Sequence, residues 1–142
     1  MITLASAQTI IASSLSHARS ENMPPMTVAV LDAGAQLVAF AREDRSSLLR
    51  EKIARAKAHG ALNLGVGSRS LVKRAESHAQ FFNSLVGLSD GNVIPVPGGV
   101  LIRDAAGEIV GSVGVSGHLP DADEACAVVG IEAAGLVADP GE

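Results

Sequence analysis

Two segments of the chain share one hairpin pattern, and this repetition limits the fold more than any other feature of the sequence. Residues 26–41 and 99–115 each contain two short apolar runs joined by a five-residue turn. Each turn opens with an aspartate, Asp32 or Asp104, five residues before the aliphatic residue that resumes the strand. Polar turns of this kind join neighbouring antiparallel strands, and in the first turn Gly34 is available for positive φ. The sequence therefore predicts two β-hairpins.

Helical patterns occupy most of the remaining chain. Apolar residues recur every three or four positions, with looser spacing in the third region, over residues 3–19, 49–60, 68–86 and 122–136. Ser46 and Ser47 are expected to cap the second region. Because helices and hairpins do not alternate as βαβ units, we expect an α+β fold in which an antiparallel sheet built from two hairpins is flanked by helices. We expect a single domain over residues 1–138 and a tail at 139–142.

The composition indicates close packing and an assembly of several copies. Hydrophobic residues make up 47% of the chain but aromatic residues only 2%, so small aliphatic side chains must fill the core between closely packed backbones. A monomer of this mass exposes about 6,800 Å², and 11 basic and 15 acidic residues are few for that area. Both faces of the strand at residues 27–31 are apolar, so a helix or a second copy must cover each face. We therefore expect a homo-oligomer.

Charge and spacing argue against several classes of function. A net charge of −4 does not suit nucleic-acid binding, and no apolar run approaches the roughly 20 residues of a membrane span. The lone Cys126 has no disulfide partner and is expected to be a small buried side chain. The N-terminus lacks a basic segment followed by a continuous apolar segment, so we expect a cytoplasmic protein. No metal site is expected, because the histidines form no ligand motif: His17, His59, His78 and His118.

Two short segments come close to known catalytic or cofactor motifs without matching them. Residues 65–70 resemble G-x-G-x-x-G, but the last position is Ser70 and the preceding pattern is helical. Residues 114–118 resemble G-x-S-x-G, but His118 takes the place of the second glycine. Neither a dinucleotide site nor a serine hydrolase is supported.

The glycine-rich segments at 95–99 and 111–118 carry the strongest indication of a site. One interpretation is structural: glycines allow close backbone approach, and Asp121 with Glu124 forms a capping box at the start of the last helix. The other interpretation is that turn N–H groups lie exposed near a helix N-terminus, where they can hold an anion. The groups concerned are those of Gly98, Gly99, Ser116 and Gly117. The two interpretations are compatible.

Six motifs follow one another along almost the whole chain: Val28–Gly34, Ile53–Ala58, Pro97–Val100, Gly111–Gly117, Asp123-Glu124 and Gly130-Ile131. In this order they resemble the GlcG/HbpS family, also known as DUF336 or the haem-degrading domain family. The most specific part is the G-x-[IV]-G-V-S-G…D-E signature, formed by the fourth and fifth motifs.

The resemblance implies a compact α+β domain with an antiparallel sheet and flanking helices, in a layout like that of profilin and PAS domains, and commonly an oligomer. The functions attached to the family are haem binding or degradation, accessory roles in glycolate-utilisation operons, and a C-terminal module of corrinoid adenosyltransferases. Two residues depart from the family pattern. Leu101 stands where many relatives have Pro, and Gly60 where a Thr often follows K-A-x. Both border the expected pocket, so the ligand can differ from haem.

The first hypothesis is therefore a small-ligand or haem-binding protein that acts as a homo-oligomer. Lys57 would pair with a ligand carboxylate or a haem propionate. The expected ligand-binding residues are Lys57, Pro97, Gly98, Gly99, Ser116, Gly117, His118 and Asp123.

The alternative hypothesis is an enzyme of small-molecule catabolism, of the isomerase or lyase type, that transfers a proton on a carboxylated or carbonyl substrate. Lys57 or Glu124 would be the base, and the glycine-rich backbone would hold the anion. A third hypothesis is an accessory subunit with a structural role and no ligand.

Overall fold

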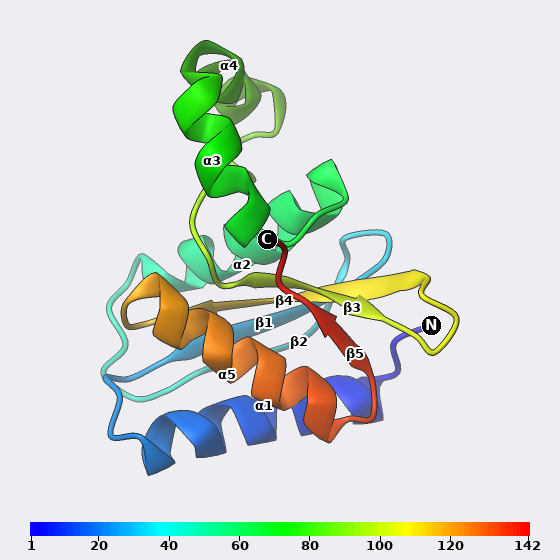
Figure 1. Ribbon diagram of the computed structural model, residues 1–142. Coiled ribbons are helices and arrows are strands. Elements are labelled where there is room, and N and C mark those ends of the chain that lie inside the picture. Colours follow the sequence, from blue (N-terminus) through cyan, green and yellow to red (C-terminus); the bar gives the residue numbers. More distant parts are fainter.

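The computed structural model describes residues 1–142 as a sheet with helices on both faces (Figure 1). All pairings in the five-stranded sheet are antiparallel, and the strand order is β2-β1-β4-β3-β5. The strands are β1 (Thr27–Asp32), β2 (Leu37–Arg42), β3 (Gly99–Arg103), β4 (Ile109–Ser116) and β5 (Val137–Asp139). The helices are α1 (Leu4–Ser20), α2 (Arg50–Leu64), α3 (Arg69–Ser77), α4 (Ala79–Leu88) and α5 (Pro120–Ala133). The predicted α+β class is confirmed.

The two predicted hairpins form with the same turn. In the first, Asp32 Oδ1 accepts two backbone N–H groups, two and four residues further on, at 2.9 Å each. Asp104 Oδ1 does the same in the second, also at 2.9 Å. The expectation for Gly34 is wrong, because the positive φ falls one residue later, on Ala35 (φ 62°). The equivalent residue of the second turn is Gly107 (φ 86°), which takes this conformation without a steric penalty.

The hairpins join through β1 and β4, whose register runs from Thr27 opposite Ser116 to Asp32 opposite Gly111. This pairing places β1 between two neighbours and leaves β2 at an edge. At the other edge the sheet gains β5, which pairs with β3. The sequence patterns did not predict β5.

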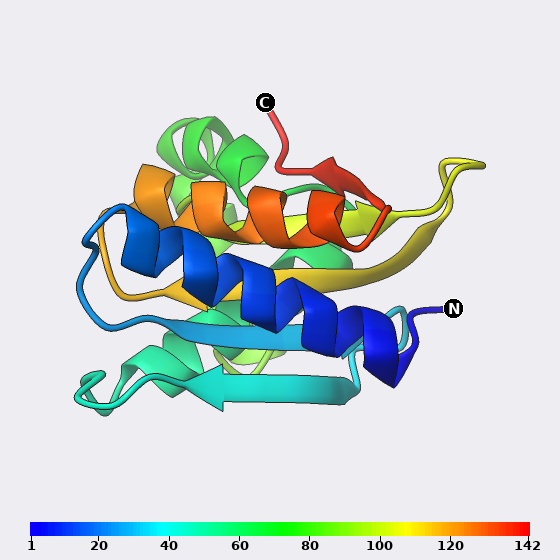
Figure 2. The ribbon, with the colours of Figure 1, turned by 90° about the horizontal axis from the view of Figure 1, so that it is seen from below.

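The helices form one layer on each face of the sheet. Helices α1 and α5 pack against each other on one face, and α2 lies across β1, β4 and β3 on the other face (Figures 1 and 2). Strand β1 is therefore covered on both sides by helices of its own chain, and residues 27–31 are all buried. This accounts for the apolar character of both its faces without a second copy.

Small residues let the layers approach closely, as the composition indicates. A Cβ at Gly114 would overlap the carbonyl oxygen of Ala54 on α2, and one at Gly99 would overlap that of Lys57. At the crossing of α1 and α5, a Cβ at Gly130 would overlap the Ser14 hydroxyl. These glycines fix the distance from α2 to the sheet and from α5 to α1.

Helices α3 and α4 project beyond α2, away from the sheet (Figure 1). They enclose a small apolar cluster of their own, made by Leu71, Phe82, Leu85 and Val93. Three large apolar side chains of α4 remain exposed: Phe81, Val86 and Leu88.

The expected serine caps of the second helix are not used. Helix α2 begins at Arg50, and its N-cap Leu49 supplies no side-chain bond. Ser46 instead accepts a hydrogen bond from the Thr27 hydroxyl at 3.1 Å, which ties this loop to the start of β1. None of the helices combines the length and the apolar character that crossing a bilayer requires.

Candidate functional site

A buried ion pair connects α2 to α5. Lys57 Nζ lies 2.9 Å from Asp123 Oδ2 and donates a second hydrogen bond to the Val115 carbonyl at 3.0 Å. The side chains are 3% and 1% exposed. Two of the sequence candidates are thus each other's partner, and neither is open to solvent.

Burial dominates the titration of both groups. It lowers the pKa of the Lys57 ammonium and raises the pKa of the Asp123 carboxyl, and in each case the charge of the other partner opposes the shift. Each charge therefore depends on its partner, because burial alone disfavours both charged forms.

The turn from Ser116 to His118 is built around Asp123. The second carboxylate oxygen, Oδ1, accepts the backbone N–H of His118 at 2.8 Å, so the chain's own aspartate holds the end of this turn. The Ser116 hydroxyl is buried and accepts from Arg50 Nη1 at 3.1 Å. The His118 side chain is exposed.

The two glycines after Pro97, Gly98 and Gly99, pack closely against Lys57. Gly98 has φ 119°, and a Cβ there would lie 2.8 Å from Lys57 Nζ, so a side chain would displace the ammonium. The N–H of Gly99 donates to the Ser68 hydroxyl at 2.8 Å and is buried. The N–H groups of Gly99 and His118 therefore already have partners within the chain.

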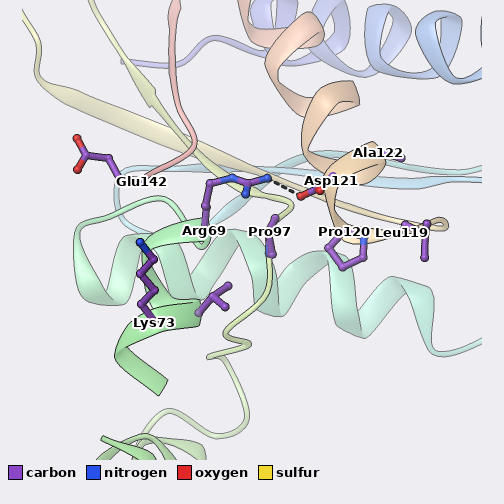
Figure 3. A pocket seen from close by; sticks show the side chains of 9 residues that line it. Arg69, Lys73, Pro97, Leu119, Pro120, Asp121, Ala122 and Glu142 are labelled. Atoms are coloured by element: carbon purple, nitrogen blue, oxygen red, sulfur yellow. Dashed lines mark hydrogen bonds and ion pairs between the residues drawn. The ribbon is translucent and has the colours of Figure 1, made fainter. Parts of the chain in front are cut away.

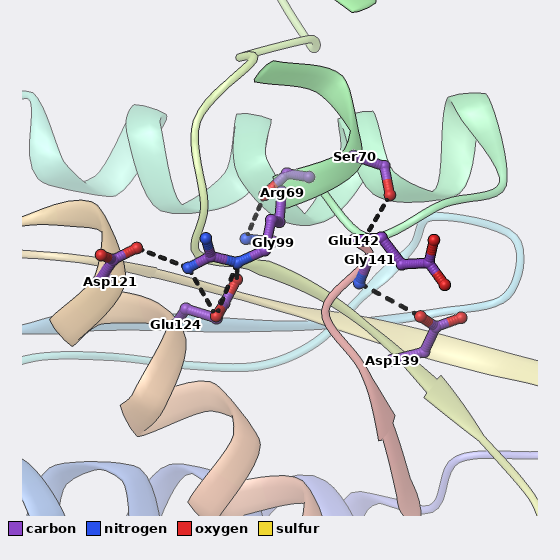
Figure 4. Close-up of polar contacts among 9 residues, drawn as sticks. Arg69, Ser70, Gly99, Asp121, Glu124, Asp139, Gly141 and Glu142 are labelled. Carbon is purple, nitrogen blue, oxygen red and sulfur yellow. Dashed lines mark hydrogen bonds and ion pairs between the residues drawn. The ribbon is translucent and has the colours of Figure 1, made fainter. Parts of the chain in front are cut away.

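Arg69, at the start of α3, binds two carboxylates of α5 (Figure 4). Its Nε lies 3.0 Å from Glu124 Oε2, its Nη2 lies 3.0 Å from Glu124 Oε1, and Nη2 also contacts Asp121 Oδ1. These hydrogen bonds raise the pKa of the guanidinium above its ordinary value, and those to Glu124 contribute most.

The expected capping box does not form. Helix α5 begins at Pro120 with Leu119 as N-cap, so Asp121 lies inside the first turn. Proline suits the first helical position because its φ is already helical and it has no N–H to satisfy. Glu124 consequently serves as the ligand of Arg69.

Residues 139–142 run alongside the start of α3 (Figure 4). The Pro140 carbonyl accepts the N–H of Arg69 at 3.2 Å, and the N–H of Glu142 donates to the Ser70 hydroxyl at 2.8 Å. This contact brings Glu142 to the same surface as Arg69.

A pocket of about 800 Å³ opens between α3, α5 and the residue before the Gly98 turn (Figure 3). Its apolar wall comes from prolines and aliphatic side chains, and four charged side chains stand around it. The lining residues are Arg69, Val72, Lys73, Pro97, Leu119, Pro120, Asp121, Ala122 and Glu142.

Of the sequence candidates, Pro97 lines this pocket directly. His118 immediately precedes Leu119 of its wall. Glu124 lies behind Arg69, while Lys57, Gly98, Gly99, Ser116, Gly117 and Asp123 are buried. The sequence analysis missed Arg69, Lys73 and Leu119, and no local motif distinguishes them from ordinary surface residues.

The side chains form no cluster of metal ligands, and the one thiol is not reactive. No three His, Cys, Asp or Glu side chains lie together in a way that could hold a metal ion. Cys126 is fully buried, and burial raises the pKa of its thiol to about 11. The thiol therefore stays protonated and shielded at neutral pH.

A family model described as haem degrading protein HbpS-like matches residues 2–132. The chain belongs to the HbpS-like family. Of its signature glycines, Gly114 lies on β4 against α2, Gly111 lies on β4 against β1, and Gly117 follows the strand. Its Asp-Glu pair lies on α5, where Asp123 turns inward to Lys57 and Glu124 outward to Arg69.

Solved structures with the HbpS-like fold cover nearly the whole chain. A structure described as the PduOC:heme complex has a TM-score of 0.86 at 20% identity, covering 95% of this chain and 96% of that one. The Klebsiella pneumoniae protein ORFY has a TM-score of 0.84 at 25% identity, with 94% and 90% covered. HbpS has a TM-score of 0.78 at 23% identity, with 92% and 88% covered. Among curated proteins, none matches this chain.

Proposed function

We propose that this HbpS-like protein binds haem, or another ligand that combines a flat apolar body with a carboxylate, in the pocket between α3 and α5. The observation that carries the proposal is the pocket itself. At about 800 Å³ it lies within the size range of small-molecule and cofactor sites, which are mostly apolar with a few polar groups that orient the ligand.

The two kinds of lining residue suit the two parts of such a ligand. Pro97, Leu119 and Pro120 offer an apolar wall, and Leu119 is 68% exposed, so a flat ligand would cover surface that water now contacts. Lys73 is exposed at the same pocket and makes no ion pair, which leaves its ammonium free for a carboxylate. Arg69 is already held by Glu124 and Asp121.

The residues of this pocket can be compared with the parts of haem that they would have to bind. The apolar wall suits the macrocycle and Lys73 suits a propionate. None of the lining residues is a histidine, cysteine, methionine or tyrosine, the usual axial ligands. His118, with its exposed side chain next to Leu119, is the residue beside the pocket that could ligate iron. Bound haem would supply iron chemistry, and the residues of this chain would bind and orient it.

Binding is favoured over proton transfer by the positions of the candidate bases. Lys57 is 3% exposed and hydrogen-bonded to Asp123 and Val115, so a substrate does not reach its amine. Glu124 is held by Arg69. We propose instead that Lys57 and Asp123 keep Pro97 and the start of α5 in place behind the pocket.

The proposal includes a homo-oligomer in the cytoplasm. Phe81, Val86 and Leu88 expose a large apolar surface on α4, a pattern typical of protein contacts. A reduced, buried Cys126 is compatible with a reducing compartment. Light scattering should give a mass of at least twice 14.4 kDa. A monomer at micromolar concentration would contradict the oligomer.

Haem titration followed in the Soret band tests the binding proposal. Because the chain has no Trp or Tyr, its own near-ultraviolet absorbance is low. We expect a saturable shift at micromolar haem. The Leu119→Asp variant should fold, because Leu119 is the N-cap of α5 and aspartate is favourable at that position. It should bind haem about tenfold more weakly, because it places a charge on the apolar wall of the pocket. Leu48→Asp, at an exposed position outside the pocket, is the matched control.

A second pair of variants separates the charge from the apolar contact. Lys73→Gln should weaken haem binding, while Lys52→Gln, which removes the same charge from the exposed side of α2, should leave it unchanged. The absence of a saturable Soret shift in the wild-type protein, or equal loss in the control variants, would refute the proposal.

A further inference from the structure

A second cavity, of about 340 Å³, lies at the side of α2 that faces the β1–β2 turn. Two of its residues, Arg55 and His59, stand one helical turn apart on α2. Lys57, midway between them in sequence, points to the opposite side of the helix, toward the pocket already described. The lining residues are Leu31, Ala35, Gln36, Leu37, Arg55, His59 and Asn92.

Two polar atoms in this cavity wall are buried and have no hydrogen-bond partner in the protein. They are Arg55 Nε and His59 Nδ1, and they are the two such side-chain atoms of the chain. Arg55 is otherwise engaged through Nη2, which lies 3.3 Å from Glu51, and its guanidinium stands over the Phe40 ring at 5.6 Å. Buried polar atoms without partners are destabilising and rare in native proteins, so two of them at one cavity point to a missing partner. Arg55 Nε is a donor, and His59 Nδ1 is also a donor when the imidazole carries its proton there, so the partner that suits both is an acceptor.

The charge of the cavity differs from that of the pocket between α3 and α5. Its lining includes Arg55 and His59 but no aspartate or glutamate. Glu51 lies outside the lining, and its pair with Arg55 leaves Nε free. Leu31, which is buried, and Leu37 form the apolar side of the cavity.

Gly60 of α2 allows the segment before β3 to lie close to the helix, where this segment forms a third wall of the cavity. A Cβ at this residue would lie 3.1 Å from the Asn92 carbonyl oxygen and from Val93 Cα, so a side chain would push the segment before β3 outward. The same carbonyl accepts a hydrogen bond from Asn63 Nδ2 at 3.1 Å, which holds Asn92 beside His59. The cavity thus depends on a residue without a side chain next to its histidine.

We infer that this cavity binds a short-chain monocarboxylate. Because both atoms are covered in the empty cavity, the Arg55 and His59 side chains turn toward the carboxylate, which then accepts hydrogen bonds from Arg55 Nε and His59 Nδ1. The alkyl group lies against Leu31 and Leu37. An oxyanion with no alkyl group, such as phosphate, finds the two donors but not the apolar contact, and an uncharged amide finds the apolar contact without the charge. The site is separate from the haem pocket proposed above.

Imidazole NMR signals provide a direct assay, with butyrate as the probe and butyramide and inorganic phosphate as comparisons. We expect the His59 signal to shift saturably with butyrate, at a Kd in the millimolar range or tighter. The signals of His17, His78 and His118 should stay in place and serve as internal controls. Butyramide and phosphate should bind at least tenfold more weakly.

Matched variants test the two donors. Arg55→Gln should weaken butyrate binding at least tenfold, as should His59→Gln measured by calorimetry, whereas Arg74→Gln on exposed α3 should leave it unchanged. Unchanged haem titrations in Arg55→Gln would show that the two sites are independent. An unshifted His59 signal at saturating millimolar butyrate, or equal effects of Arg55→Gln and Arg74→Gln, would overturn the inference. A stronger response to phosphate than to butyrate would overturn the assignment to a carboxylate.

Discussion

Breaking the ion pair between Lys57 and Asp123 should cost more stability than any other change of charge in this protein. Lys57→Met keeps the length and apolar stem of the side chain but removes the ammonium. It leaves Asp123 Oδ2 and the Val115 carbonyl, which now contact Nζ at 2.9 and 3.0 Å, without a donor. Because the partners are 3% and 1% exposed, water cannot replace the lost contact. A buried charge left alone costs about 3–5 kcal/mol.

Asp123→Asn is the reciprocal change and should cost a similar amount, about 3–5 kcal/mol. Its amide oxygen can still accept the His118 N–H, so the turn keeps that contact and the lost stability reports on the charge. In the double variant neither charge remains. Its free energy of unfolding should therefore lie within about 2 kcal/mol of the wild-type value, well short of the sum of the single losses.

Urea unfolding followed by far-ultraviolet circular dichroism measures all four proteins. Tryptophan fluorescence is not an option, since the chain contains no Trp. The free energy of unfolding should fall by several kcal/mol in each single variant and recover in the double variant. Single losses below about 1 kcal/mol, or a double loss equal to their sum, would show that the pair is neither desolvated nor coupled.

Three further predictions concern packing, the α3–α5 ion pairs and the thiol. Gly114→Ala should cost about 3 kcal/mol or more in urea unfolding, because its Cβ overlaps a carbonyl of α2, whereas Gly87→Ala, with nothing within 4 Å, should stabilise α4 by about 0.5–1 kcal/mol. Glu124→Gln should cost about 1–2 kcal/mol of stability, because Glu124 is largely buried beside Arg69. Asp121→Asn should cost less than about 0.5 kcal/mol, because the Asp121 side chain is 82% exposed. Equal losses in the two variants would contradict this difference in burial. Cys126 has a raised folded pKa of about 11 against 9.0. The unfolded chain therefore loses its thiol proton first, so the thiol lowers stability between pH 9.0 and 11, and Cys126→Ala should remove this contribution.

The sequence predicted the local parts of the fold because their causes are local. The turns after Asp32 and Asp104 are each held by one aspartate within five residues, and this pattern is visible in the sequence. The pairing of β1 with β4 joins residues 79 to 89 positions apart and has no local signal. Strand β5, three residues long, is too short to show an alternating pattern.

The same distinction applies to the site. Lys57 and Asp123 were both candidates, but their pairing spans 66 residues and depends on the close approach of α2 to the sheet. The capping interpretation of Asp121 and Glu124 relied on spacing alone. It overlooked Pro120, which starts the helix two residues earlier and leaves Glu124 to Arg69.

A crystal structure of the protein grown with haem is the most direct test of the central proposal. The account predicts the macrocycle between α3 and α5, against Pro97 and Leu119, with a propionate within hydrogen-bonding distance of Lys73 Nζ. Haem bound at another surface, or crystals that exclude haem while this pocket stays open to solvent, would contradict it.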